Sequence, residues 1–202
     1  FDHALDLPAL VRRDGCPAYG SPSLTNLLNA AGLGRHAVVV EPHRAYSIGP
    51  FVVRFVPSRH SKLVFGLRVP IDGELSCSET ENLGARDFRC GRVYGIHIQA
   101  GDFSLYHQGS ADLIDEELDL RADLFLCGIA GRGFTDRFLP RILGRLRPRA
   151  VLPHHFDNFF LPVAAPMGFS LNVNYGAFLD EVAAVDPGLP VRSLAPLETV
   201  VG

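Results

Sequence analysis

Two different hydrophobic periods, one in the middle of this 202-residue chain and one near its end, restrict the possible fold most strongly. The middle contains two alternating segments, Val93–Gln99 and Phe103–Gln108, which predict a β-hairpin around a short Gly-containing turn. Further on, a buried strand at Asp123–Ala130 precedes an amphipathic helix at Thr135–Leu146, with Thr135 as its N-cap. A β-rich middle followed by strand–helix alternation predicts a layered α/β fold.

The other predicted elements fit the same architecture. Helices are expected at Leu7–Arg13, from Ser21 to about Ala31 and around Tyr175–Val185, and strands at Cys16–Gly20, Ala37–Glu41, Phe51–Val56, Ala150–Leu152 and Val191–Leu194. No internal repeat or linker interrupts residues 1–202, so we expect one domain. Residues Ser61–Gly91 lack periodicity and read as a long loop, which in a compact domain is usually functional.

Composition excludes several classes of protein. The chain is 47% hydrophobic, enough for one core, and its formal net charge of −3 gives no basic field for nucleic acid. Its longest apolar stretches, such as Leu124–Ala130, have the length of a strand and do not predict a membrane span. The four cysteines are too scattered for a zinc clip, and we expect reduced thiols in a cytoplasmic protein.

Side chains that can bind a metal follow several predicted strands. His60 comes after Phe51–Val56, Ser110 and Asp112 come after Phe103–Gln108, and His155 comes after Ala150–Leu152. A single histidine is more often a surface or core residue than a ligand. An ordered series at successive strand ends instead predicts a site along one sheet edge. Imidazole and carboxylate together suit zinc, manganese or iron better than calcium.

The same residues resemble motifs of the metallo-β-lactamase superfamily. Phe1–His3 resembles the second half of its H-x-H-x-D-H motif, and His60 resembles its third motif. Tyr106–Asp112 resembles the strand that normally ends in Gly-Asp, and Val151–Phe159 resembles the last motif, P-x-H followed by an aromatic residue. These matches span nearly the whole chain in family order. They are nearest to the branch that contains ascorbate-6-phosphate lactonase.

The resemblance implies an α/β fold of four layers, the αββα metallo-β-lactamase sandwich. Because the first motif starts partway through, we expect a domain that is N-terminally truncated and lacks its first strands. The two leading histidines would be missing with them. Exposed apolar edges and low stability would follow for the chain expressed alone.

The resemblance also implies roles for individual residues. His60 would bind one metal ion, while Asp2, His3 and His155 would bind a second; Asp2 would also orient the attacking water and is the predicted catalytic residue. His154, beside the last ligand, would support the site or contact the substrate.

The bridging aspartate of the family falls at Ser110, whose protonated hydroxyl is a poor ligand. Asp112 could replace it as a metal ligand. Alternatively, Asp112 could cap the segment Leu113–Leu118, because aspartate is favourable at a helix start. Both roles of Asp112 stay open.

The implied activity is metal-assisted hydrolysis, in which one or two divalent ions activate a water molecule. Zinc is the expected metal, with manganese or iron as alternatives. The expected partner is a small-molecule substrate, an ester, lactone or phosphodiester, with no nucleic acid and no membrane; a homo-oligomer is compatible with the sequence. The alternative is a non-catalytic or degenerate member of the fold with one or no metal. A serine hydrolase is disfavoured because no G-x-S-x-G motif is present.

Two segments near the predicted site have two possible roles each. The loop Ser61–Gly91 could cover the substrate beside His60, although a solvated loop face is the favoured interpretation. Counted together with Arg59 and Arg92, which flank it, the segment has six basic and five acidic residues. The aromatic run Phe156–Phe160 could line the pocket, but packing in the core is favoured.

Overall fold

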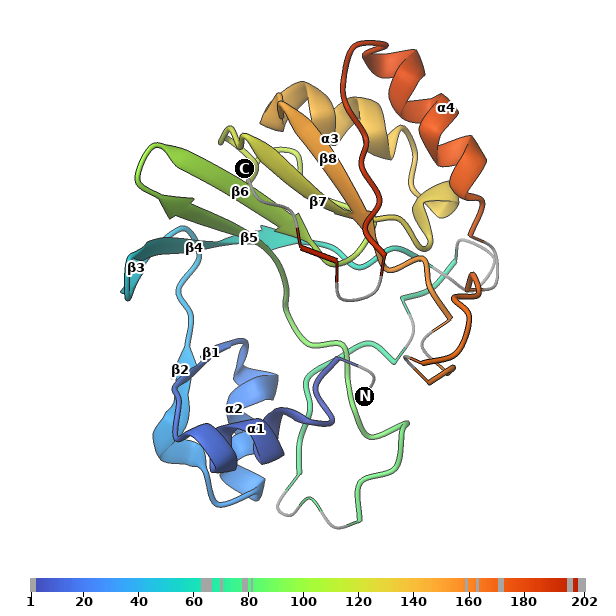
Figure 1. The fold of residues 1–202 in the computed structure, drawn as a ribbon. Coiled ribbons are helices and arrows are strands. Elements are labelled where there is room, and N and C mark those ends of the chain that lie inside the picture. The colour runs from blue at the N-terminus through green and yellow to red at the C-terminus, as the bar shows by residue number, and fades with distance from the viewer. Residues whose placement is uncertain are drawn as a thin grey trace.

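The computed structural model describes residues 3–62, 67–69, 71–77, 80, 82–158, 160–162, 164–170, 173–195 and 198–199 (Figure 1). Its centre is a six-stranded sheet in the order β3-β4-β5-β6-β7-β8. The strands are β3 (Ala45–Ile48), β4 (Phe51–Ser58), β5 (Val93–Ala100), β6 (Phe103–Gln108), β7 (Leu124–Gly128) and β8 (Ala150–His154). Strands β3 to β6 pair antiparallel, and β6, β7 and β8 pair parallel.

Two helices cover one face of this sheet, which we call the outer face. They are α3 (Phe138–Leu146) and α4 (Tyr175–Val185), and the short 3-10 helix η2 (Arg132–Phe134) precedes α3 (Figure 1). Five apolar residues of α3 recur at helical spacing and are buried against the sheet. Beneath these helices, the outer face of β6, β7 and β8 carries Tyr106, Phe125 and Val151, which are at most 1% exposed. The main core of the molecule therefore lies on the outer face.

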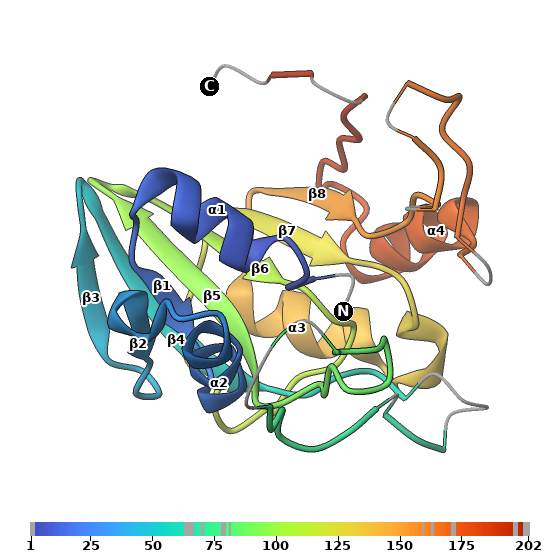
Figure 2. The ribbon, with the colours of Figure 1, turned by 90° about the horizontal axis from the view of Figure 1, so that it is seen from below.

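The other face of the sheet, the inner face, carries a second and smaller sheet. Strands β1 (Ala18–Gly20) and β2 (Ala37–Val39) pair parallel, with the 3-10 helix η1 (Gly34–His36) leading into β2. The small sheet belongs to residues 3–44, which we call the small lobe. Its apolar contacts reach β3, β4 and β5, where Tyr19 joins the cluster around Val53 and Phe55. Figure 2 shows the small sheet on the β3–β5 side.

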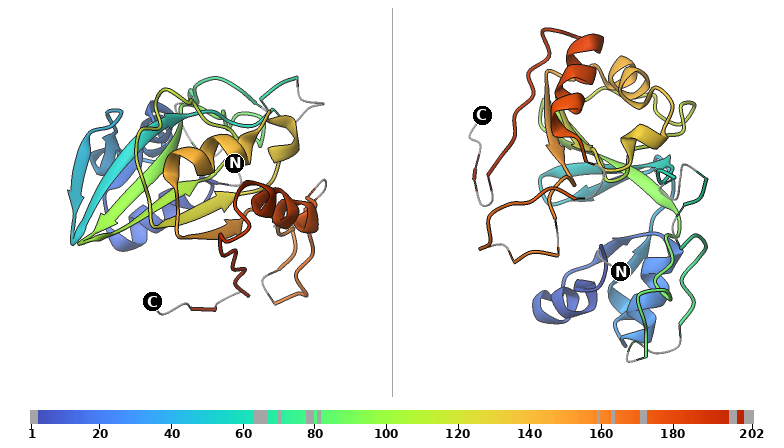
Figure 3. Two further views of the ribbon diagram at one scale, coloured as in Figure 1. Left: turned by 90° about the horizontal axis from the view of Figure 1, so that it is seen from above. Right: turned by 90° about the vertical axis from the view of Figure 1, so that its right-hand side faces the viewer.

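Helices α1 (Leu7–Asp14) and α2 (Pro22–Ala30) form the last layer. Val11 of α1 and Leu28 of α2 are buried against Ala18 of β1. The order of layers is thus helices α3 and α4, the large sheet, the small sheet, and helices α1 and α2 (Figure 3, right). The predicted four-layer αββα arrangement is confirmed.

The structure differs from the prediction at three elements. Helix α3 begins at Phe138 rather than Thr135, because Arg137 adopts a left-handed backbone (φ 45°) and no side chain caps the helix. Strand β3 was not predicted; it pairs with β4 through a turn at Gly49, whose φ of 58° favours glycine. Near the C-terminus, the predicted strand Val191–Leu194 is reduced to one bridge between Val191 and Val151.

The long loop after β4 packs on α2 in its described part. The Ser23 hydroxyl donates to Glu74 at 2.5 Å and accepts from the backbone N–H of Leu75 at 2.9 Å, while Leu75 and Phe88 are buried with Leu27. Within the described residues, no helix is both long and apolar enough to cross a membrane.

Candidate functional site

Four strands of the large sheet end at one common edge. Strands β4 and β6 both run antiparallel to β5, and β6, β7 and β8 are parallel to one another. The segments that follow β4, β6 and β8 carry His60, Ser110 and His155 respectively. The chain topology therefore brings the polar residues of three separate motifs to the same sheet edge. Their roles as ligands stay predictions.

Two histidines that are far apart in the sequence, His3 and His155, meet beside this edge. The rings of His3 and His155 have centroids 5.2 Å apart, with planes tilted by 44°. His155 follows β8 with a left-handed backbone (φ 57°), a conformation that costs a non-glycine residue about 1 kcal/mol. The contacts around His155 therefore have to offset this backbone cost. Asp2, the predicted partner of this pair, lies outside the described residues.

A second pair of histidines lies next to the first. His107 on β6 and His154 on β8 stack with ring centroids 4.6 Å apart and planes at 15°. The Nε2 atom of His154 is buried, and no described residue hydrogen-bonds to it.

Burial lowers the pKa of both rings in this stacked pair. For His154 the pKa falls to about 4, because desolvation acts together with the nearby His107 and His155, and backbone groups of Leu126 and Gln108 offset only part of the shift. For His107 the pKa is lowered first by burial and then by His3. A stacked pair of this kind is neutral at pH 7.

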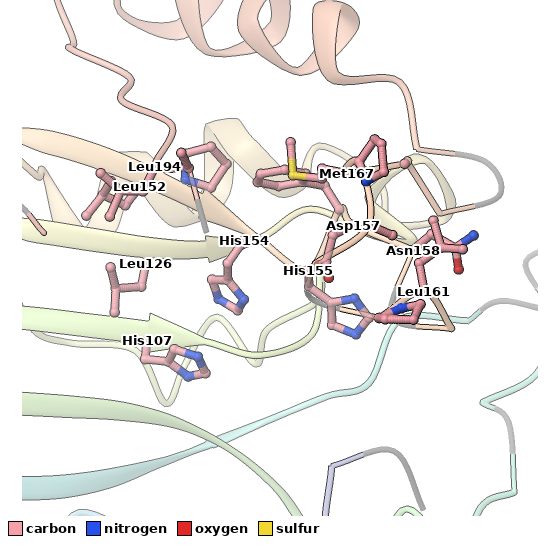
Figure 4. Close-up of a pocket in the computed structure, with 17 residues that line it drawn as sticks. His107, Leu126, Leu152, His154, His155, Asp157, Asn158, Leu161, Met167 and Leu194 are labelled. Carbon is pink, nitrogen blue, oxygen red and sulfur yellow. The ribbon is translucent and has the colours of Figure 1, made fainter. Parts of the chain in front are cut away.

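These rings form one wall of a cavity of about 610 Å³ (Figure 4). His107, His154 and His155 stand in a row, with Leu126, Leu152 and Leu194 at one end and Met167, Asn158 and Leu161 at the other. The cavity lies on the inner face of β6, β7 and β8, since His107, Leu126 and Leu152 line it. Residues of the segment after β8 form much of the remaining lining. A concave, largely apolar site with a few polar groups is the usual form of a small-molecule site.

His60 and Asp112 line a different pocket, of about 450 Å³. This pocket also contains the cationic residues Arg59, Lys62 and Arg92, and residues of the long loop form part of its wall. The Nδ1 atom of His60 lies 2.7 Å from the backbone oxygen of Ser61. A carbonyl oxygen only accepts, so Nδ1 carries the proton and the lone pair of Nε2 is left for a ligand.

Ser110 and Asp112 are both engaged in hydrogen bonds within the protein. The Ser110 hydroxyl accepts from the backbone N–H of Ser61 at 2.9 Å. Asp112 Oδ1 accepts from the N–H of Leu113 at 2.8 Å and lies 3.8 Å from Nη1 of Arg141. The segment after Asp112 forms a turn rather than a helix. The local contacts of Asp112 agree with a role in holding this turn, and its role as a ligand stays a prediction.

A buried glutamine supports the loop that carries these two residues. Gln108, at the end of β6, is fully buried, and its side-chain nitrogen lies 2.8 Å from the Ser58 hydroxyl. The same nitrogen lies 2.8 Å from the backbone oxygen of Ser110 and 2.7 Å from that of Asp112. The chain after β6 is therefore tied to the end of β4, next to His60.

The side chains described fit a metal ion only in part. Among them, no three His, Cys, Asp or Glu residues are arranged as a metal-binding group. The pair His3 and His155 and the available Nε2 of His60 nevertheless provide imidazole donors of the kind that zinc prefers. The carboxylate that would complete the predicted set at His3 and His155 is that of Asp2, which is outside the described residues.

Two residues of the cavity were not assigned to the site from the sequence. In the sequence His107 lies within the segment Tyr106–Asp112 but received no role of its own. Strand alternation places it on the same face as Leu105, and it pairs in register with Leu126 on β7. That alternation could have identified it once the inner face was known. Phe156, expected to pack, is 6% exposed within the core and also lines the cavity, so it does both.

Comparison with known proteins connects this geometry to a fold. The metallo-beta-lactamase fold protein YhfI from Bacillus subtilis is 15% identical, with a TM-score of 0.59 over 96% of this chain and 70% of its own. Igni18, a metallo hydrolase from the archaeon Ignicoccus hospitalis, is also 15% identical, with a TM-score of 0.58 over 98% of this chain and 73% of its own. The chain therefore has the metallo-β-lactamase fold.

Relatives in sequence are named as metal-dependent hydrolases. A UPF0173 metal-dependent hydrolase from Anaeromyxobacter dehalogenans is 28% identical over 202 residues, which covers 95% of this chain and 67% of that protein. A UPF0173 metal-dependent hydrolase from Anaeromyxobacter sp. strain K matches with the same identity and coverage. No family model matches the chain.

Proposed function

We propose that this protein is a metal-dependent hydrolase that acts on a small molecule at the common edge of β4, β6, β7 and β8. The observation that carries the proposal is the meeting of His3 and His155 beside an apolar cavity, in a chain with the metallo-β-lactamase fold. The sequence relatives named as metal-dependent hydrolases support the same reaction class.

In this proposal Asp2, His3 and His155 hold one divalent ion, and His60 contributes to a second. Zinc is the proposed metal because imidazole nitrogen dominates the donor set. When bound, such an ion lowers the pKa of a water molecule and polarises the bond to be broken. The residues of the chain supply orientation: the ring of His155 lies against that of His3, and Gln108 ties the loop of Ser110 to the end of β4.

The substrate is proposed to be an ester, a lactone or a phosphodiester. The cavity places its apolar wall and its imidazole row within one space, so a substrate bound there would have a cleavable group next to His155. The proposal also includes membership of the UPF0173 hydrolases and a closer relation to ascorbate-6-phosphate lactonase. Identification of the substrate tests both parts.

Metal analysis of the purified protein tests the proposal. We expect bound zinc or manganese, at least about tenfold less of it in His155→Ala and in His3→Ala, and no change in His36→Ala, which alters a histidine on η1 away from both pockets. Circular dichroism of each variant shows whether the fold is retained. Absence of metal in the wild-type protein after incubation with zinc, manganese or iron would refute the proposal and favour the non-catalytic alternative.

Replacement of Ser110 sharpens the experiment. The serine stands where the resembling family has a bridging aspartate, and its hydroxyl accepts a hydrogen bond from Ser61. We expect Ser110→Asp to raise the number of ions bound per chain, while Ser110→Ala leaves it unchanged. An increase with alanine, or a loss with aspartate, would show that Ser110 does not occupy a ligand position.

A further inference from the structure

The cavity on the inner face differs in charge from the neighbouring pocket at His60. Three cationic residues, Arg59, Lys62 and Arg92, line the pocket at His60 together with the two carboxylates of Asp72 and Asp112. The residues described around the larger cavity include no lysine or arginine, and Asp157 is their one carboxylate. The two pockets at this edge therefore favour different ligands.

No lysine or arginine outside the described residues can supply a cation to the cavity. All 19 lysine and arginine residues lie within the described ranges, so the remaining positions add none. Arg192, two residues before Leu194 of the cavity, pairs with Glu198 at 3.4 Å. Away from the divalent ion proposed at His3 and His155, a phosphate or carboxylate in this cavity would find no side chain of opposite permanent charge. Burying an unpaired charge is costly.

The cavity is also shaped for an apolar group. Its volume of about 610 Å³ falls within the usual range of small-molecule sites. Apolar side chains from three separate segments surround it, among them Leu126, Leu152, Leu161, Ala165, Met167 and Leu194. Figure 4 shows the histidine row along one wall, so an apolar group in the cavity lies directly beside the imidazoles.

We propose that this cavity binds the uncharged, apolar part of the substrate, so that the substrate is a neutral ester or lactone with an apolar acyl chain rather than a phosphodiester. This inference rests on the proposed hydrolase function, since it names the substrate class of the same site. The basic pocket at His60 would then not receive the acyl chain.

Two fluorescent probes with the same ring system test the inference without any turnover. N-phenyl-1-naphthylamine is uncharged, and 1-anilinonaphthalene-8-sulfonate adds one sulfonate to it. We expect the neutral probe to bind at least about tenfold more tightly, because the sulfonate would enter a cavity without a lysine or arginine. Equal or tighter binding of the sulfonate would overturn the inference.

A matched pair of leucines locates the binding. Leu161 lines the cavity and Leu10 lies on α1, and both are 43% exposed, so neither replacement removes a core residue. We expect Leu161→Gln to weaken binding of the neutral probe about tenfold and Leu10→Gln to leave it unchanged. Ala165→Trp, which fills the cavity, gives a second variant with the same expected loss. Unchanged binding in both cavity variants would overturn the inference.

Hydrolysis assays separate failure of this inference from failure of the proposed function. With the metal-supplemented protein, we expect 4-nitrophenyl octanoate to be cleaved with a kcat/KM at least about tenfold above that of 4-nitrophenyl acetate or bis(4-nitrophenyl) phosphate. Faster cleavage of the phosphodiester would keep the hydrolase and refute the apolar substrate. Probe binding as expected, with no cleavage of any ester, would keep the ligand class of the cavity and refute the hydrolase.

Discussion

The two faces of the large sheet are made by the same strands but are used differently. On the outer face, Tyr106, Phe125 and Val151 are at most 1% exposed beneath α3 and α4. On the inner face, their chain neighbours His107, Leu126 and Leu152 are only half-buried and border the cavity. Because strand side chains alternate between faces, one strand can contribute both to the core and to a binding site. Helices α3 and α4 exclude water from the outer face, whereas the small lobe leaves the β6–β8 part of the inner face open to a ligand.

The sharpest test of this contrast compares two adjacent residues of β7. Phe125→Ala removes a fully buried ring from the outer face and should cost about 3–5 kcal/mol of unfolding free energy. Leu126→Ala, on the half-buried cavity side, should cost only about 1 kcal/mol. Urea unfolding at constant m-value measures both. Equal losses would mean that the inner face is as well packed as the outer face.

A smaller effect is expected from the ion pair that anchors the outer helices. Arg132 is 7% exposed, pairs with Glu181 of α4 at 3.0 Å and donates to the backbone oxygen of Asn174 at 2.7 Å. Glu181→Gln should cost about 1–2 kcal/mol, because it leaves a buried guanidinium without its carboxylate, although Glu181 itself is half-exposed.

The control for this ion pair lies in the small lobe. Arg44 and Glu41 form an exposed pair there, so Glu41→Gln should change the unfolding free energy by less than about 0.5 kcal/mol. A larger loss of unfolding free energy in Glu41→Gln than in Glu181→Gln would contradict the larger contribution expected of the buried ion pair on the outer face.

Helix capping should give the next effect in size. The Asn174 side chain accepts a hydrogen bond from the N–H of Ala177 at 2.9 Å and so caps α4 on the outer face. Asn174→Ala should cost about 1 kcal/mol. Ser21, the N-cap of α2 in the inner lobe, makes no such side-chain bond, so Ser21→Ala should cost under about 0.5 kcal/mol by thermal or urea unfolding. The reverse order would show that the caps are formed differently in solution.

The smallest expected effect is a pH dependence of stability carried by the outer face. His97 of β5 is 6% exposed, and burial lowers its pKa below the ordinary histidine value of about 6.5. As the pH falls below that value, the unfolded chain takes up a proton that the folded chain does not, so stability is lost; above it, stability is fully present. Unfolding free energies at pH 7.5 and 5.5 should therefore differ less in His97→Gln than in the wild-type protein. An unchanged difference would show that His97 takes no part.

Much of the fold could be predicted from the sequence because local signals specified it. The hairpin of β5 and β6 and the helix Tyr175–Val185 were predicted within one residue, since alternation, turn glycines and helical spacing all act over short distances. Strand β3 was missed, because its four residues lie among turn signals and are stabilised by pairing with β4. The start of α3 was placed at Thr135, but Arg137 turns left-handed, and its backbone conformation depends on tertiary packing.

The candidate site divides in the same way. The sequence by itself determined which polar residues follow the strands, and hence that His60, Ser110 and His155 reach one edge once the strand order is known. The resemblance already implied that His3 and His155 share a site, and the structure places their rings 5.2 Å apart. Only the tertiary structure decided that His107 stacks on His154, and that His60 borders a pocket separate from the apolar cavity. The physical reason is range: periodicity assigns a side chain to a face, but what covers that face depends on contacts between segments far apart in the chain.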